Sequence, residues 1–115
     1  MEMVFSTPKL RKILNSSKEC QKAFGAEQAK RILMRLQALA AAENLEVMRN
    51  LPGRCHELSQ DRTGQFALDL KHPFRLVFQP ADNPVPTKAD GGVDWKQVTA
   101  VEILQSFSLT AEESL

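Results

Sequence analysis

Cysteine is scarce in this sequence, which has only Cys20 and Cys55 in 115 residues. The two do not form a CxxC pair, and neither belongs to a Cys/His cluster with the spacing of zinc ligands. His56 directly follows Cys55, but this single pair is too sparse a ligand set for a structural metal. We therefore expect two free thiols, no metal and no other cofactor, as is usual in a reducing compartment.

A long hydrophobic run is also missing. No stretch approaches the ~20 apolar residues that span a bilayer. The first eight residues lack the basic flank and apolar core of a secretory signal. We therefore expect a cytoplasmic protein with no membrane partner. The chain is 43% hydrophobic and 25% charged, which is typical of a globular protein, and its length suits one domain over residues 1–115.

Neither sign of charge dominates, since the formal net charge is +1, but the two parts of the chain differ in net charge. Residues 1–75 contain 13 Lys/Arg and 8 Asp/Glu, a net of +5, whereas residues 76–115 contain 2 and 6, a net of −4. A basic first part suits a polyanionic partner. Ordinary solvated surface charge accounts for the same counts at least equally well.

The first part of the chain predicts helices. Thr7 and Pro8 suit the N-cap and first position of one helix. Ser16 and Glu19 fit a capping box at the start of a second, and Gly25 suits its end.

The longest expected helix covers 26–42, followed by a short helical turn that Asn44 caps and Pro52-Gly53 ends. Apolar side chains recur at helical spacing along the long helix, and basic side chains take its other face. The apolar positions are Ala29, Ile32, Leu33, Leu36, Leu39 and Ala40.

From residue 54 the hydrophobic period changes to two, which predicts strands. The apolar positions of 66–70 and 74–78 fall on one face if paired residue numbers sum to 144, with a turn at 71–73. This register places Asp69 opposite Arg75 on the other face. Short strands are expected at 3–5 and 98–104, and the segment 105–115 is expected to be an irregular tail.

Residues 80–97 contain three prolines, three aspartates and the pair Gly91-Gly92, which predict a long loop. Trp95 is expected to pack this loop against the body, although base stacking is an alternative. The predicted fold class is α+β, with N-terminal helices packed on a small antiparallel sheet. Such a fold supports many functions, so it does not decide between them.

Three segments are more specific in combination: LPGRCHEL (51–58), DRTGQFALDLKHPFRLVF (61–78) and DGGVDWKQVTAVEIL (90–104). This ordered set resembles the RelE/ParE toxin superfamily, in particular its HigB-like branch of plasmid-maintenance killer proteins. The resemblance covers roughly residues 3–104 and implies a RelE-like fold.

The resemblance also implies the toxin of a type II toxin–antitoxin system, held silent by a helix-turn-helix antitoxin. Toxins of this kind cleave mRNA on the ribosome and so inhibit translation. In the implied metal-independent reaction, a ribose 2′-hydroxyl attacks the adjacent phosphate. Such a site needs a base, cations around the phosphate and an acid for the leaving oxygen.

On this resemblance, Arg75 and His56 are the expected catalytic residues. Arg75 matches a sheet arginine that contacts the scissile phosphate, and His56 matches a histidine of the first sheet strand that serves as acid or base. A cross-strand salt bridge from Arg75 to Asp69 and a hydrogen-bonded structural role for His56 are the alternatives.

The expected RNA-binding residues are Arg54, Arg62, Lys71 and His72. Arg54 shares a strand face with His56, and Arg62 lies in the turn beside the family's cleft. Lys71 and His72 lie in the hairpin turn. The alternative for Arg54 and Arg62 is a solvated surface position, and Lys71 and His72 are expected first as turn residues, with RNA contact as the lesser alternative.

Two departures from the family pattern favour other readings. Asp69 replaces an arginine of some active relatives and would repel RNA. The tail after the last strand contains none of the family's histidine or tyrosine. The alternatives are a catalytically weakened toxin that acts mainly by binding its antitoxin, and a ParE-like inhibitor of DNA gyrase.

Overall fold

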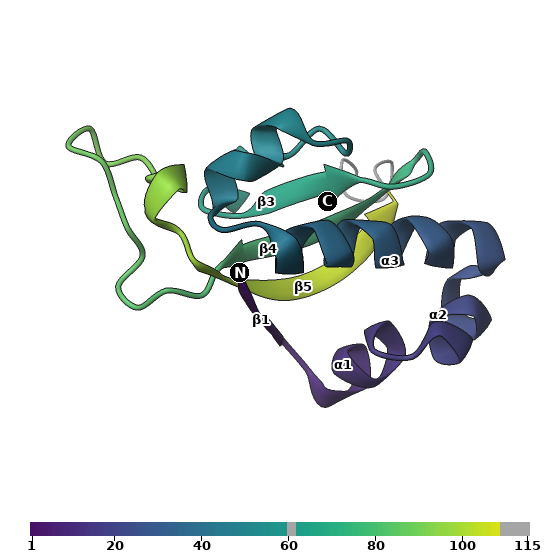
Figure 1. The fold of residues 1–115 in the computed structure, drawn as a ribbon. Coiled ribbons are helices and arrows are strands. Elements are labelled where there is room, and N and C mark those ends of the chain that lie inside the picture. The colour runs from purple at the N-terminus through teal and green to yellow at the C-terminus, as the bar shows by residue number, and fades with distance from the viewer. Residues whose placement is uncertain (60–61, 109–115) are drawn as a thin grey trace.

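The computed structural model describes residues 1–59 and 62–108, with side chains up to Leu104. The described residues form three α-helices and a five-stranded sheet of order β1-β5-β4-β3-β2, in which β1 precedes the helices and the other four strands follow them (Figure 1). The elements are β1 (Glu2–Phe5), α1 (Pro8–Leu14), α2 (Ser17–Phe24), α3 (Ala26–Ala41), η1 (Leu45–Asn50), β2 (His56–Glu57), β3 (Phe66–Asp69), β4 (Phe74–Pro80), η3 (Trp95–Gln97) and β5 (Ala100–Ser108).

The first two helices begin where their caps predict. The Thr7 hydroxyl accepts a hydrogen bond from the amide of Leu10 at 3.1 Å. The Ser16 hydroxyl accepts one from the amide of Glu19 at 3.2 Å. Gly25 ends α2 with a φ of +84°, a conformation that a side chain disfavours.

The long helix α3 crosses one face of the sheet, in front of β4 and β5 in Figure 1. Its fully buried side chains, such as Ile32 and Leu39, pack with Phe66, Leu76 and Ile103 of the sheet in one core. The apolar stripe predicted for this helix is therefore confirmed as core except at Ala40, which is exposed. Within the described ranges no helix is long and apolar enough to cross a membrane.

The predicted β-hairpin register is confirmed. Phe66 pairs with Phe78, Leu68 with Leu76, and Asp69 with Arg75, so each pair sums to 144. The core residues of both strands face α3, except that Phe74 at the start of β4 is 41% exposed.

The edges of the sheet differ from the expectation. The opening strand β1 pairs with β5 in parallel, so the sheet is antiparallel only from β5 to β2. The last strand runs to Ser108 rather than ending at Leu104, so the irregular tail predicted from residue 105 was wrong for its first four residues. A register shift opposite Val77/Phe78 breaks the alternation of β5, while its backbone continues to pair with β4. Residues 109–115 of the predicted tail lie outside the described residues.

The loop predicted between β4 and β5 is present, and Trp95 fixes it to the body. Pro80 belongs to β4, and η3 closes the loop. The Trp95 ring is buried edge-on against Phe66, with centroids 4.9 Å apart. The Arg49 guanidinium lies 3.7 Å from the centre of the same ring. Asn44 precedes η1 but makes no side-chain cap, contrary to the prediction.

Candidate active site

The face of the sheet turned away from α3, here called the outer face, gathers several of the predicted site residues. His56 pairs with Ala67, and Ala67 with Val77, so these three side chains form one row across β2, β3 and β4. The next row contains the pair Asp69 and Arg75. Two residues along a strand cover about 6.6 Å, so side chains from the two rows reach one another.

Arg54 joins the second row through its side chain. Its Nε lies 2.8 Å from Oδ2 of Asp69 and its Nη2 lies 3.3 Å from Oδ1. The two side chains are 66% and 40% exposed. The hydrogen bonds to Asp69 and the charge of its carboxylate raise the pKa of Arg54. Asp69 therefore forms an ion pair with Arg54 on the outer face.

His56 has a defined orientation. Its Nδ1 lies 2.7 Å from the backbone carbonyl oxygen of Arg54. A carbonyl oxygen only accepts hydrogen bonds, so Nδ1 carries the proton in this contact. In the neutral imidazole Nε2 then has the free lone pair, which is the form that accepts a proton from a substrate hydroxyl.

A small apolar cluster adjoins these polar groups on the outer face. It consists of Leu58, Ala67 and Val77, all buried, with Leu104 packed against them. His56 and Arg75 are half-buried beside this cluster. Charged interactions are stronger next to an apolar surface than in bulk water, so the two side chains are well placed to act on a phosphate.

The backbone under the site is fixed by contacts that the sequence did not reveal. Arg35 of α3 donates from Nε to the carbonyl of Asp69 at 2.9 Å. The amide of Asp69 donates to the carbonyl of Gly53 at 2.7 Å. A Cβ on Gly53 would lie 2.9 Å from Nε of Arg35 and 3.1 Å from Cδ2 of Leu68. Pro52-Gly53 was the available signal, but it indicated only the end of a helical turn.

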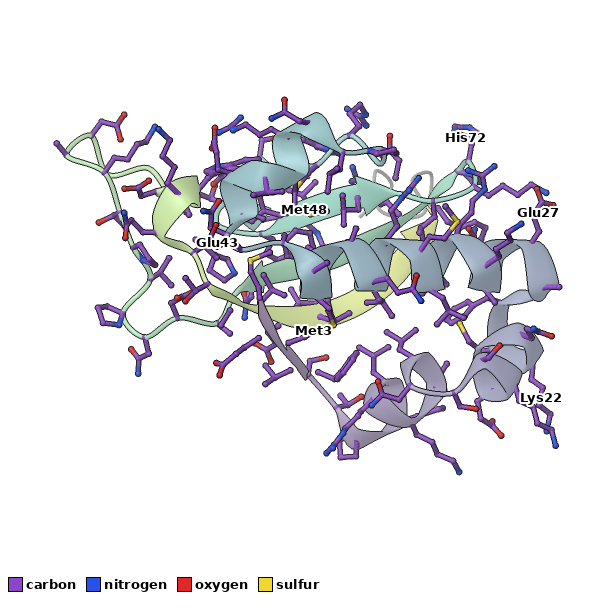
Figure 2. All side chains as sticks on the ribbon, viewed as in Figure 1. Met3, Lys22, Glu27, Glu43, Met48 and His72 are labelled. Atoms are coloured by element: carbon purple, nitrogen blue, oxygen red, sulfur yellow. The ribbon has the colours of Figure 1, made fainter. Side chains whose placement is uncertain are left out.

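Lys71 and His72 lie at the tip of the β3–β4 hairpin, apart from the rows described above. Glu27 and His72 occur at the same end of the molecule (Figure 2). The Lys71 ammonium lies 2.7 Å from Glu27, and this contact lowers the pKa of the Glu27 carboxyl. Gln28 accepts from the amide of Lys71 at 2.9 Å and donates to its carbonyl at 3.2 Å. A shallow hollow of about 350 Å³ is lined by Lys71 and His72 together with α3 residues.

Arg62 lies in the turn between β2 and β3. Its Nη1 donates to Oε1 of Gln65 at 2.9 Å. Gln65 comes two residues before Ala67, which belongs to the row that contains His56. Arg54, His56 and Arg75 are therefore brought together, Arg62 lies at the β2–β3 turn, and the hairpin-tip pair lies elsewhere.

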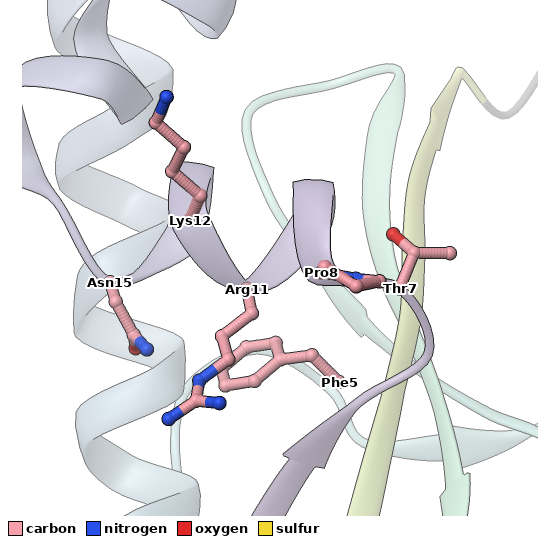
Figure 3. A pocket seen from close by; sticks show the side chains of 6 residues that line it. All are labelled: Phe5, Thr7, Pro8, Arg11, Lys12 and Asn15. Atoms are coloured by element: carbon pink, nitrogen blue, oxygen red, sulfur yellow. The ribbon is translucent and has the colours of Figure 1, made fainter.

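A larger hollow, of about 480 Å³, lies between the end of β1 and α1 (Figure 3). Its lining is Phe5, Thr7, Pro8, Arg11, Lys12 and Asn15. None of these residues was predicted to be functional, and none belongs to the outer-face rows. The size of a hollow does not by itself identify a reactive site, and the chemistry here is concentrated on the sheet.

The two thiols are free, and neither is activated. Burial raises the pKa of Cys55 to about 12, against a smaller opposing effect of Arg49. Burial also raises the pKa of Cys20. Only a thiolate is an effective nucleophile, so neither cysteine is suited to attack a substrate.

The comparisons with known proteins concern the fold. No protein-family model matches the sequence, and no curated protein sequence matches it. The structure is similar to the YoeB/ParE toxin from Agrobacterium tumefaciens, with a TM-score of 0.56 and 13% identity over 92% of this chain and 95% of that one. It is also similar to the YoeB dimer from Staphylococcus aureus, with a TM-score of 0.52 and 17% identity over 91% and 92%. The chain therefore has the RelE-like α+β fold of these toxins, as the sequence predicted.

Proposed function

We propose that this chain is the toxin of a type II toxin–antitoxin system and that it inhibits translation by cleaving mRNA on the ribosome. The observation that carries the proposal is the outer-face arrangement. On a RelE-like sheet, Arg54 and Arg75 lie at either side of Asp69, and the histidine of the adjacent row presents a proton-accepting nitrogen. The HigB-like motifs of the sequence support the same assignment.

In the proposed reaction, side chains supply the base and the cations, and water supplies the acid. Nε2 of His56 takes the proton of a ribose 2′-hydroxyl, whose oxygen attacks the adjacent phosphorus. The bond from phosphorus to the 5′-oxygen breaks, leaving a 2′,3′-cyclic phosphate, and water supplies the proton to the departing 5′-oxygen. Arg75 and Arg54 stabilise the additional negative charge on the phosphate.

The proposed partners follow from this chemistry and from the family resemblance. They are ribosome-bound mRNA as substrate and a helix-turn-helix antitoxin that silences the toxin in the cytoplasm. Arg62 at the nearby turn, and Lys71 and His72 at the hairpin tip, are proposed to contact RNA outside the reacting phosphate. Such contacts contribute affinity and salt dependence.

Expression of the chain alone in a bacterial host tests the proposal. We expect growth arrest and new mRNA 5′ ends in phase with codons, both abolished by Arg75→Ala. The variant's folding is checked through the fluorescence of Trp95, which is the only tryptophan. Normal growth with an unchanged pattern of mRNA ends would contradict the proposal.

A catalytically weakened toxin that acts mainly by binding its antitoxin is the second candidate. The ion pair between Arg54 and Asp69 favours it, because a cation already paired with a carboxylate is less available to phosphate. Tight antitoxin binding without any new mRNA ends would support this candidate. A ParE-like gyrase inhibitor is the third, and inhibition of DNA supercoiling by the purified protein would identify it.

A further inference from the structure

We infer that Asp69 is an affinity-determining residue: its carboxylate occupies Arg54 and must be displaced before that arginine binds an RNA phosphate. The inference rests on the proposed RNA-binding role of the outer face. It adds that the unsubstituted chain binds RNA more weakly than it would if Asp69 carried no charge.

The geometry of the pair is that of a carboxylate in the place of a phosphate. Two nitrogens of Arg54 contact the two oxygens of Asp69, at 2.8 and 3.3 Å. Paired donors of this kind match carboxylates and phosphates equally well. A phosphate on the outer face therefore competes with Asp69 for the same two N–H groups.

The exposure of the pair makes this competition reversible. The Arg54 side chain is 66% exposed and the Asp69 side chain 40% exposed. Ion pairs in such surroundings contribute little to folding, because water and salt screen them. The carboxylate is thus not required to hold the strands together.

The backbone of Asp69 performs the structural role instead. Its carbonyl accepts from Arg35 at 2.9 Å, and its amide donates to Gly53 at 2.7 Å. Both contacts are independent of the side chain. Asp69→Asn therefore removes the charge, retains an oxygen that accepts from Arg54, and leaves the local backbone in place.

The test is the binding of a short fluorescein-labelled single-stranded RNA, with 2′-O-methyl riboses to prevent cleavage, across a range of salt concentrations. Asp69→Asn should tighten binding about tenfold at low salt. It should also steepen the slope of log K against log salt by about 0.7, which corresponds to one additional phosphate contact on a single strand. Asp69→Ser is a second neutral variant for the same measurement.

The matched control is Asp90→Asn. It makes the same change in net charge in the loop before η3, where the 70% exposed Asp90 lies 3.9 Å from Lys88. That loop and the C-terminal end of β3 lie at opposite ends of the molecule (Figure 1). The control variant should bind RNA with the affinity and salt slope of the unsubstituted protein.

Measurements in Arg54→Ala distinguish displacement of the Asp69 carboxylate from Arg54 from simple repulsion between that carboxylate and RNA. In Arg54→Ala the substitution Asp69→Asn should give no gain, because the competed cation is absent. A gain that persists there would overturn the inference, as would equal affinity of Asp69→Asn and Asp90→Asn for RNA. Failure of the unsubstituted protein and all variants to bind RNA would instead overturn the proposed function itself.

Discussion

The imidazole of His56 and the backbone of Arg54 are linked by a 2.7 Å contact between Nδ1 and the carbonyl oxygen. Arg54 thus orients the ring through its backbone, while its side chain pairs with Asp69 in the second row. The link ties the proposed proton acceptor, His56, to the Arg54 cation, because both depend on the conformation of the segment that enters β2. Arg54 itself has a φ of +50°, so this segment turns sharply just before the strand.

Replacing His56 with asparagine should separate RNA binding from cleavage. The asparagine amide still donates to the Arg54 carbonyl but does not accept a proton. Cleavage should fall about 10²- to 10⁴-fold with unchanged RNA affinity.

His72→Asn provides the matched control, because His72 is the only other histidine and lies at the hairpin tip. We expect it to retain the rate of cleavage at saturating protein concentration, because its proposed RNA contact lies outside the reacting phosphate. Equal losses in the two variants, measured by single-turnover cleavage of labelled mRNA on ribosomes, would rule out the assignment of His56 as the base.

Of the two α3 side chains that contact Lys71 at the hairpin tip, Gln28 should stabilise the fold more than Glu27. The 8% exposed Gln28 side chain makes two hydrogen bonds to the backbone of Lys71. Gln28→Ala should lower the free energy of unfolding by about 1–3 kcal/mol. Glu27→Gln removes only an exposed ion pair and should have little effect. Urea titrations followed by Trp95 fluorescence measure both, and a larger loss for Glu27→Gln would contradict this account.

Gly53 should be less tolerant of substitution than Gly25. Both have positive φ, +115° and +84°, but a Cβ on Gly53 would meet Arg35 and Leu68, whereas one on Gly25 meets nothing within 4 Å. Gly53→Ala should therefore cost more than about 1 kcal/mol of stability and exceed the cost of Gly25→Ala. It should also weaken RNA binding, because Arg54 is the next residue. Thermal unfolding and RNA titration of the two variants check this, and a reversed order would show that Gly53 is not closely packed.

The ionised carboxylate of Asp82 should stabilise the folded protein, and this stabilisation should be lost in acid. Burial alone would raise its pKa, but hydrogen bonds from the hydroxyl and amide of Thr99, at 2.8 and 3.1 Å, and from the amide of Ala100, at 3.1 Å, lower it overall. A lowered folded-state pKa means that this contribution is complete above the ordinary value of 3.8 and disappears as the pH falls through the lowered one.

Asp82→Asn should therefore lower stability at neutral pH, by about 1–2 kcal/mol, and make unfolding less dependent on pH in the acid range. Urea unfolding at several pH values checks both effects. Asp90→Asn, at a more exposed carboxylate, should produce smaller changes. If the free energy of unfolding fell equally with decreasing pH in Asp82→Asn and in the unsubstituted protein, Asp82 would not contribute to this pH dependence.

Local chemistry made much of the fold predictable. The caps at Thr7 and Ser16 and the period-two register of the hairpin depend on near neighbours in the chain, and all three are confirmed. The parallel pairing of β1 with β5 joins segments almost a hundred residues apart, which no local pattern encodes. The continuation of β5 past Leu104 depends on backbone pairing with β4, so its side chains gave no signal.

The candidate site was partly predictable for the same reason. Strand alternation placed Asp69 and Arg75 on the face away from the core, and the structure agrees. The ion pair between Arg54 and Asp69 was not predictable, because Arg54 reaches the carboxylate from an irregular backbone at positive φ. The support from Arg35 was also hidden, since a basic residue on a helix face is solvated by default.

The proposed activity is tested most directly with purified protein and ribosomes carrying a labelled mRNA. We expect cleavage with 2′,3′-cyclic phosphate ends in the unsubstituted protein and in His72→Asn, cleavage slower by about 10²- to 10⁴-fold in His56→Asn, and none above background in Arg75→Ala. Cleavage at equal rates in all four proteins, or in none of them while the mRNA stays intact, would contradict it.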